Sequence, residues 1–414
     1  MYHQLRKEMN VMNKRFLSYI ISLVVIFSCW APVYAADEAA LSKPETVISP
    51  SMDFIGVPIT LTLAEAVKRI TTEGPGYESA VLKKETFEKQ ALEQEETWNQ
   101  FRQISNAILA ESAKGGSTMQ TNPMKSLNAK IVKMTRPYLL TQAAIQYQMD
   151  INNLAYETTQ SYYRGIQAAE AERIAVENLK NVKNTLTNTN KKFELGVVSK
   201  LEVLQAESAV LEAEAQLGTA EVNYKTLRMA FNQKLGYPLM QNVVLTDKLT
   251  RTTQSSIYLK GCIESALEKR NELAQLQYVL DTAQLRLDDK VMVSRYRAEY
   301  LTALLDLREA EKRLNDTKTM IELDIRSRYL NIMNIQKEIT SLEKKVSNAL
   351  ESYRLSELSY NAGMNTLTDV QSAQLGSYQA QLGLSNKILE LNLAMNELSL
   401  VIGYGKPVAD GGGQ

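Results

Sequence analysis

Histidine and cysteine are the scarcest chemically versatile residues of this 414-residue chain, which has one histidine and two cysteines. His3 and Cys29 lie within residues 1–35, which we predict to be a removable signal peptide, so Cys262 alone would remain. One cysteine cannot form an intramolecular disulfide, and a chain without histidine lacks a common general base and zinc ligand. No nucleophile–base set, phosphate-binding glycine loop or metal cluster stands out, so we expect neither an enzyme nor a cofactor.

Proline and net charge are also low. Only 9 prolines and 18 glycines occur in the chain, so long uninterrupted helices are allowed. The 47 basic residues are balanced by 47 acidic ones, which does not suggest a basic surface for nucleic acid. With 44% hydrophobic residues, the chain has enough apolar material for a large folded body.

Residues 1–35 have the three parts of a secretory signal peptide. Two basic residues precede an apolar run at 16–30, and small residues then favour cleavage after Ala35. The apolar run is shorter than the ~20 residues of a membrane-spanning helix, so a retained anchor is the less favoured alternative. Translation from either Met1 or Met12 fits this pattern, and we expect export to the cell envelope.

Hydrophobic patterning divides the rest of the chain into two helical halves. Three prolines indicate an extended lead-in, and helical sequence starts near Leu63. The predicted organisation is a lead-in at 36–60, a first helical repeat at 61–238, a linker at 239–260, a second helical repeat at 261–404 and a flexible tail at 405–414.

Two helices are expected to be unusually long. After a loop at 114–123, helical sequence runs from near Met124 to Leu195, with Pro137 as a candidate kink or later start. Such a helix would be roughly 90–105 Å long. In the second half, helical sequence continues to about Asn361, with at most a weak interruption at 315–316. Helices of this length need partner helices along their length.

One short motif occurs twice, once in each half of the chain. Glycine is followed by serine or threonine three residues on and by an acidic residue three further: Gly196, Ser199 and Glu202 in the first copy, and Gly363, Thr366 and Asp369 in the second. The offset between these two copies also relates Leu-Gly-Tyr at 235–237 to Ile-Gly-Tyr at 402–404. Glycine favours a helix C-terminus, and Ser/Thr with Glu/Asp at this spacing forms a capping box, so each copy predicts a tight helix–turn–helix reversal.

The helix after each motif carries apolar and small residues at alternating three- and four-residue steps, which predicts coiled-coil-like packing. The predicted first seam is Leu201, Leu204, Ser208, Leu211, Ala215, Gly218, Val222, Lys225 and Met229. The predicted second seam is Val370, Ala373, Ser377, Ala380, Leu384, Lys387, Leu391, Ala394 and Leu398. Cys262, at the start of the second half, is expected to pack as a small hydrophobic residue.

The duplicated halves, the opening Ala-Leu-Glu-Lys-Arg-Asn-Glu-Leu at 266–273, and the paired Gly motifs with their Gly-Tyr ends resemble the outer-membrane efflux protein (TolC) family. The resemblance covers most of the chain after the signal peptide. It implies a homotrimeric tube through which substrates pass unconverted. It also implies an adaptor (membrane fusion) protein at the periplasmic tip and an inner-membrane pump beyond it.

The resemblance places the two Gly motifs at that tip. The implied adaptor-docking residues are Leu195, Gly196, Val197, Val198, Ser199, Ala362, Gly363, Met364, Asn365 and Thr366. The positions that match the family's entrance gate are Glu202, Tyr360 and Asp369. Asn365 and Ser372 stand where the family has a basic and a second acidic residue, so the chain departs from the gate pattern. Glu202 and Asp369 serve equally well as capping residues, and the turns could be corners without a partner.

The family's β-barrel strands are hard to find in this sequence. Each half should hold two strands of ~9–11 alternating residues. The stretches at 114–123 and 285–319 lack that alternation. We therefore expect a mainly α fold: two tandem repeats of long antiparallel coiled-coil helices, a TolC-like α-barrel protomer with β-barrel strands absent or rudimentary. Helix-to-helix turns replace the strands, or the strands are short and degenerate, and this choice leaves membrane contact undecided.

The favoured function is a TolC-like envelope conduit of a tripartite efflux or type I export system. The expected location is the outer membrane or the periplasm. The alternative is a coiled-coil scaffold or spacer of the cell envelope that transports nothing. The presence of adaptor and pump genes beside this one would favour transport.

Overall fold

The computed structural model describes residues 54–114, 122–251, 258–291 and 297–405. The predicted signal peptide, most of the lead-in and nearly all of the predicted tail lie outside these residues. The first half contains strand β1 (Ile55–Leu61), helices α2 (Leu63–Thr72), α3 (Pro75–Ala113), α4 (Leu127–Glu194) and α5 (Lys200–Lys234), the 3₁₀ turn η2 (Pro123–Lys125), and strand β2 (Gln241–Leu245). The second half contains helices α6 (Leu259–Lys269), α7 (Asn271–Lys290), α8 (Ala298–Asn361) and α9 (Leu367–Ile402).

The two longest helices run without the interruptions that the sequence suggests. Helix α4 has 68 residues and continues through Pro137, which makes it about 100 Å long. Beside the proline, the ring of Tyr138 stacks on Tyr278 of α7 with centroids 3.9 Å apart, so tertiary packing supports the helix there. Helix α8 shows no interruption at 315–316, because Leu314 is buried in the core and Lys312 bonds Asp316 across one turn at 2.8 Å.

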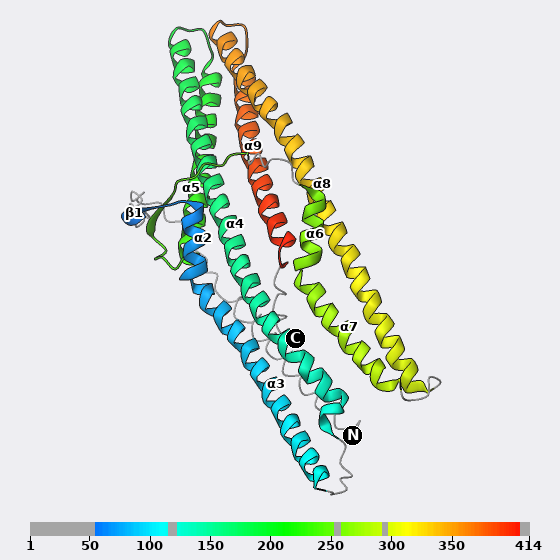
Figure 1. Ribbon diagram of the computed structural model, residues 1–414. Helices are drawn as coiled ribbons and strands as arrows, with labels where there is room; N and C mark the ends of the chain where they lie inside the picture. Colours follow the sequence, from blue (N-terminus) through cyan, green and yellow to red (C-terminus); the bar gives the residue numbers. More distant parts are fainter. Residues whose placement is uncertain (1–53, 115–121, 252–257, 292–296, 406–414) are drawn as a thin grey trace, which may run out of the picture. The chain divides into compact units, whose positions relative to one another are not determined.

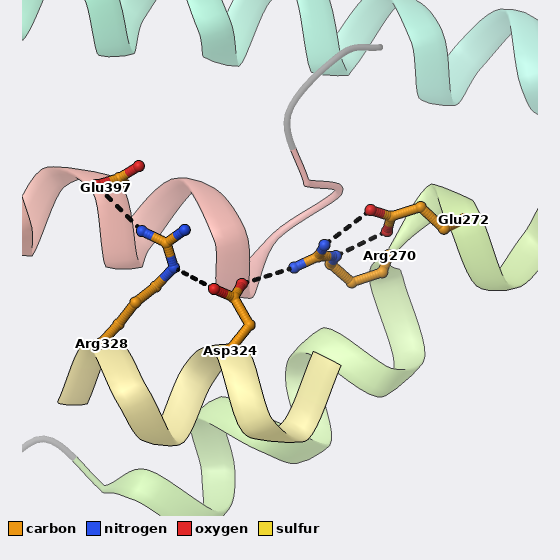
Figure 2. Close-up of polar contacts among 5 residues, drawn as sticks. All are labelled: Arg270, Glu272, Asp324, Arg328 and Glu397. Carbon is orange, nitrogen blue, oxygen red and sulfur yellow. Dashed lines mark hydrogen bonds and ion pairs between the residues drawn. The ribbon is translucent and has the colours of Figure 1, made fainter. Parts of the chain in front are cut away.

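A helix break that the sequence analysis missed lies between α6 and α7 at Arg270. The guanidinium of Arg270 donates two hydrogen bonds to Glu272, at 2.8 and 2.7 Å, and lies 3.5 Å from Asp324 of α8. Arg328 extends this network from Asp324, at 2.7 Å, to Glu397 of α9, at 3.1 Å (Figure 2). These charges hold the start of α7 to α8 and to the end of α9.

The core is built from helix pairs. Helix α4 packs on α3 and α5, α8 packs on α7 and α9, and α4 also packs on α9 (Figure 1). In the second half, a row of buried isoleucines on α8 faces α6, α7 and α9: Ile321, Ile325, Ile332, Ile335 and Ile339. Their three- and four-residue spacing puts them on one side of the helix. Cys262 packs at the edge of this cluster, as expected, and burial raises the pKa of its thiol.

The two predicted seams have different outcomes. Five of the nine residues of the second seam are buried, among them Val370, Ala380 and Leu391, and the other four are half-buried, so that prediction is confirmed. The predicted first seam is wrong, because α5 buries a different face. Leu201 is 63% exposed, and the other large aliphatic residues of that predicted seam, Leu204, Leu211 and Val222, are exposed too. Helix α5 instead buries Val203, Ala206, Val210 and Ala213. These are the true counterparts of the second seam when the two repeats are aligned on Gly196 and Gly363.

The two strands form one small parallel sheet, in which Ile59 lies beside Val243 and Leu61 beside Leu245. Strand β2 lies within the linker predicted at 239–260, and its pairing with β1 was not predicted. Tyr162 of α4 supports the sheet, since its hydroxyl donates to the carbonyl of Leu61 at 3.0 Å.

Helix ends occupy the places where the family resemblance puts pairs of long strands. Residues 114–126 join α3 to α4, and residues 291–297 join α7 to α8. The predicted fold class, long antiparallel helices in two repeats, is therefore confirmed. Among the residues that the structure describes, no helix is both long and apolar enough to cross a membrane.

Candidate functional site

The turn after α4 ends the helix with a glycine in the left-handed conformation. Gly196 has a φ of 72°, which favours glycine because it has no Cβ. The amide of Val197 donates to the carbonyl of Lys192 at 2.9 Å, and the amide of Gly196 donates to Phe193 at 2.9 Å. These two bonds form a Schellman motif, which satisfies the last carbonyls of the helix.

The turn after α8 has the same construction. Gly363 has a φ of 78°. The amide of Met364 donates to Ser359 at 2.8 Å, and the amide of Gly363 donates to Tyr360 at 3.0 Å. Each motif therefore ends one long helix and reverses the chain into the next, as predicted (Figure 1).

The two turns differ in how they cap the following helix. Thr366 and Asp369 form a complete capping box: Thr366 Oγ1 accepts from the amide of Asp369 at 3.2 Å, and Asp369 Oδ2 accepts from the amide of Thr366 at 3.0 Å. Ser199 accepts from the amide of Glu202 at 3.4 Å. The reciprocal bond is not among those of the described residues, so the predicted capping box is complete only in the second copy.

Glu202 faces the second half of the chain instead. Its Oε2 lies 3.5 Å from the hydroxyl of Tyr360 on α8. Tyr360 is only 4% exposed and packs with Ala206, Leu367 and Val370. The structure thus brings two of the three predicted gate residues, Glu202 and Tyr360, together in one cluster that joins α5, α8 and α9. The third, Asp369, is exposed and caps α9.

Two residues of α4 complete this cluster and were missed from the sequence. Thr189 Oγ1 lies 3.1 Å from the hydroxyl of Tyr360. The ammonium of Lys192 lies 3.5 Å from the centre of the Tyr360 ring and also donates to the Tyr360 carbonyl, one of the last carbonyls of α8. A lysine in the last turn of α4 is a recognisable helix-end signal, but its contact with another helix is not visible in the sequence.

Burial shifts the ionisation of this cluster. Desolvation raises the pKa of the Tyr360 hydroxyl above its ordinary value, and the nearby Glu202 carboxylate raises it further. Desolvation also lowers the pKa of Lys192, although Glu202 opposes that shift. At Asp369, hydrogen bonds from the side chain and backbone of Thr366 lower the carboxyl pKa. Desolvation is thus the main cause of the pKa shifts of Tyr360 and Lys192, whereas hydrogen bonds are the main cause at Asp369.

The turns themselves present apolar side chains to their surroundings. Val197 is 66% exposed and Met364 is 76% exposed. Leu195, Ala362 and Asn365 are exposed too, whereas Val198 is half-buried. Beside them, a groove of about 610 Å³ lies between α5 and α9 and is lined by Leu201, Leu204 and Leu375, among others. The turns and this groove thus form neighbouring surfaces that both carry exposed apolar side chains.

The fold resembles solved outer-membrane channels. It matches the outer membrane protein VceC of Vibrio cholerae with a TM-score of 0.61 and 13% identity, covering 83% of this chain and 96% of that chain. It matches the open state of the MtrE outer membrane channel of Neisseria gonorrhoeae with a TM-score of 0.57 and 14% identity, covering 83% and 89%. It matches the outer-membrane channel OprN with a TM-score of 0.56 and 13% identity, covering 91% and 99%.

Sequence comparison adds no closer assignment, because neither a family model nor a curated protein matches the chain. The resemblance to TolC-type channels seen in the sequence motifs is therefore confirmed as a likeness of fold. The described chain has a TolC-like helical fold, with its two glycine turns at the ends of α4 and α8.

Proposed function

We propose that this protein is the envelope conduit of a tripartite efflux or type I export system. The observation that carries the proposal is the pair of glycine turns, since both present large exposed apolar residues, Val197 and Met364. Val197 and Met364 occupy equivalent positions of the repeat, so both turns carry an exposed apolar side chain at the same place. The fold of outer-membrane channels supports the same function. In this proposal the chain forms a homotrimer, substrates pass through it unchanged, and no cofactor takes part.

The proposed partner at the turns is the helical hairpin of a periplasmic adaptor protein, and through it an inner-membrane pump. The docking residues are those of the two turns: Leu195, Gly196, Val197, Val198 and Ser199 in the first, and Ala362, Gly363, Met364, Asn365 and Thr366 in the second. The groove between α5 and α9 offers adjoining apolar surface for a hairpin. Helix-in-groove binding uses apolar side chains of this kind.

The cluster around Tyr360 is the proposed entrance gate. Glu202, Tyr360 and Lys192 connect the first turn to the second, so movement of one helical hairpin against the other must change these contacts. Asp369 keeps its capping role, because its carboxylate accepts hydrogen bonds from the backbone and the hydroxyl of Thr366. We therefore assign the gate to Glu202 and Tyr360 and leave Asp369 to the stability of α9.

Transport measured in cells tests the proposal. A strain without the protein should accumulate more of a fluorescent efflux substrate, or secrete less of an exported protein, and the wild-type gene should restore transport. The paired variant Val197→Ser and Met364→Ser should fail to restore it, although the protein is made at normal levels. Leu92→Ser, at an exposed apolar site on α3, is the matched control. Unchanged transport in the deletion strain would favour the envelope scaffold instead.

A further inference from the structure

A cavity lies inside one chain, where the two repeats meet. Residues of α4 and α9 line it together with Val346 of α8, and residues 247–250 of the linker after β2 form one of its walls. Its volume is about 690 Å³. A space of this size is in the range of small-molecule sites and holds far more than one water molecule.

Hydrogen bonds between α4 and α9 flank the cavity along both helices. Towards the glycine turns, Gln374 donates to the side-chain oxygen of Asn178 at 3.2 Å. At the other end, Asn396 donates to the carbonyl of Tyr156 at 3.1 Å. The lining between these two contacts includes short side chains such as Ser385. Polar contacts thus hold the two helices in place, while the short side chains leave space between them.

Both repeats hold the linker wall. The hydroxyl of Tyr162 on α4 donates to Oδ2 of Asp247 at 2.8 Å. On the other side, Asn392 of α9 donates to the carbonyl of Thr250 at 3.1 Å. The linker segment beside the cavity is therefore tied to a helix of each repeat.

Aliphatic side chains supply half of the cavity's surroundings. All six are buried or half-buried: Ile166, Ile174, Leu249, Val346, Leu384 and Ile388. A lining of this kind takes the apolar body of a ligand, and a few polar groups then fix its orientation.

Ser385 is the polar group that the protein itself leaves unused. Its side chain lines the cavity and is only 6% exposed. A serine within a helix can bond the carbonyl four residues back, and Ser399 of the same helix does so, to Met395 at 3.1 Å. The Oγ of Ser385 has no hydrogen-bond partner among the described residues. A buried hydroxyl is satisfied in nearly all proteins, so a partner from outside the chain is expected here.

The charges around the cavity cancel. Its lining contains two acidic and two basic residues: Glu170, Arg173, Asp247 and Lys248. Arg173 already donates to both carboxylate oxygens of Glu170, at 3.0 and 2.7 Å, and Lys248 is exposed. A charged ligand would lose hydration without meeting an excess of opposite charge, whereas an uncharged ligand has no such loss.

We propose that this cavity binds an uncharged, mainly apolar small molecule, whose hydrogen-bonding group pairs with the hydroxyl of Ser385. The site is separate from the two glycine turns, because Glu194 at the end of α4 lies about 30 Å along the helix from Ile174. It therefore does not depend on the proposed adaptor contact, and the ligand binds to the side of the helices rather than to their tips.

Fluorescence titration of the full exported protein with N-phenyl-1-naphthylamine tests the site. This probe is uncharged at neutral pH, becomes brighter in apolar surroundings and has one N–H that can donate to Ser385. We expect saturable binding to the wild type. Ser385→Ala should weaken it about two- to tenfold, which corresponds to one lost hydrogen bond. Ala169→Trp should also weaken it, because the indole takes up space in the cavity that Ala169 lines.

Two controls separate the site from general effects. Ser399→Ala removes a hydroxyl that bonds its own helix and should leave probe affinity unchanged. The anionic relative 8-anilinonaphthalene-1-sulfonate should bind more weakly than the uncharged probe. Because Oγ of Ser385 has no partner among the described residues, Ser385→Ala should not lower stability in urea denaturation, so its loss of affinity cannot come from misfolding.

Three results would overturn the proposal. Absence of saturable binding would show that only water fills the cavity. Equal affinity in the wild type, Ser385→Ala and Ala169→Trp would place the bound probe elsewhere on the protein. Binding of the anionic relative as tight as that of the uncharged probe would contradict the preference for an uncharged ligand.

Discussion

The hydroxyl of Tyr360 lies 3.5 Å from Oε2 of Glu202, so an acidic residue of the first repeat contacts the last turn of a helix in the second. Asp369 is the counterpart of Glu202 in the second repeat. Among the described residues it makes no contact between the repeats, and its carboxylate instead accepts hydrogen bonds from Thr366. Two positions that are equivalent in the repeat therefore have different roles. Glu202 joins the repeats, and Asp369 stabilises the start of one helix.

Removing the Tyr360 hydroxyl should weaken the contact between the repeats. Tyr360→Phe loses the hydrogen bonds to Glu202 and Thr189 while keeping the buried ring. We expect a loss of about 0.5–1.5 kcal/mol in the free energy of unfolding, measured by urea denaturation. Tyr329→Phe is the control, since no hydrogen bond of that hydroxyl is among those of the described residues, and it should change little. An unchanged stability of Tyr360→Phe would show that these bonds contribute nothing.

The glycines of the turns should resist substitution because of their backbone conformation. Gly363 has a φ of 78°, and a Cβ there would meet no atom within 4 Å. Gly363→Ala should therefore destabilise the protein through backbone strain alone, by roughly 1–2 kcal/mol. Gly376→Ala is the matched control: this glycine lies within α9, also in open space, and its replacement should be neutral or stabilising by up to about 1 kcal/mol. Thermal or chemical unfolding measures the change in stability of both variants.

The unequal caps predict unequal losses. Thr366→Ala removes a complete capping box and should cost about 0.5–2 kcal/mol. Ser199→Ala removes one longer hydrogen bond of 3.4 Å, so its effect should lie at or below the low end of that range. Equal losses in the two variants would contradict the difference between the caps.

The second cap should also depend on pH. Hydrogen bonds from Thr366 lower the pKa of Asp369 in the folded protein. A carboxyl whose folded pKa is depressed stabilises the protein above its unfolded pKa, and this stabilisation is lost as the pH falls through the folded value. The stability difference between wild type and Asp369→Asn should therefore be fully present at about pH 7, above the ~3.9 of an unfolded aspartate, and should be lost as the pH falls through the lower folded pKa. A difference that is independent of pH would show that the charge is not involved.

Arg270 should be hard to replace. Its side chain is 12% exposed and donates to Glu272 twice, in a fork that lysine cannot reproduce (Figure 2). We expect Arg270→Ala to lower the free energy of unfolding by about 1–2 kcal/mol, since the half-buried guanidinium and its two hydrogen bonds to Glu272 are lost while Asp324 keeps Arg328 as a partner. Arg270→Lys should recover only part of this loss. Arg354→Ala, which breaks an exposed pair with Glu351, should have little effect by the same measurement.

The helix architecture could be predicted from the sequence because its signals are local. Glycine with a capping residue three positions on locates both reversals, and the ends of α4 and α8 lie within a residue or two of the expected positions. The break at Arg270 was missed because it depends on charges from α8 and α9, which are distant in the sequence. The pairing of β1 with β2 likewise joins segments from opposite ends of the first half, and a short run of valines does not identify its partner.

The seam on α5 shows the limit of periodicity alone. Leucines at three- and four-residue steps indicate an apolar face, and Leu201, Leu204 and Leu211 do form one. Periodicity does not say which neighbour covers that face. The smaller residues Val203 and Ala206 pack inside the chain, where α4 comes close. Alignment of the two repeats with each other would have identified this phase, since Val203 corresponds to buried Val370.

The central claim is that the two glycine turns bind an adaptor. Site-specific crosslinking from Val197 and Met364, in the full-length protein co-expressed with its adaptor, measures this contact directly. The account predicts crosslinks from both positions to the adaptor hairpin, and none from the control position Leu92 on α3. Crosslinks confined to the flanks of the helices, with none from Val197 and Met364, would contradict it.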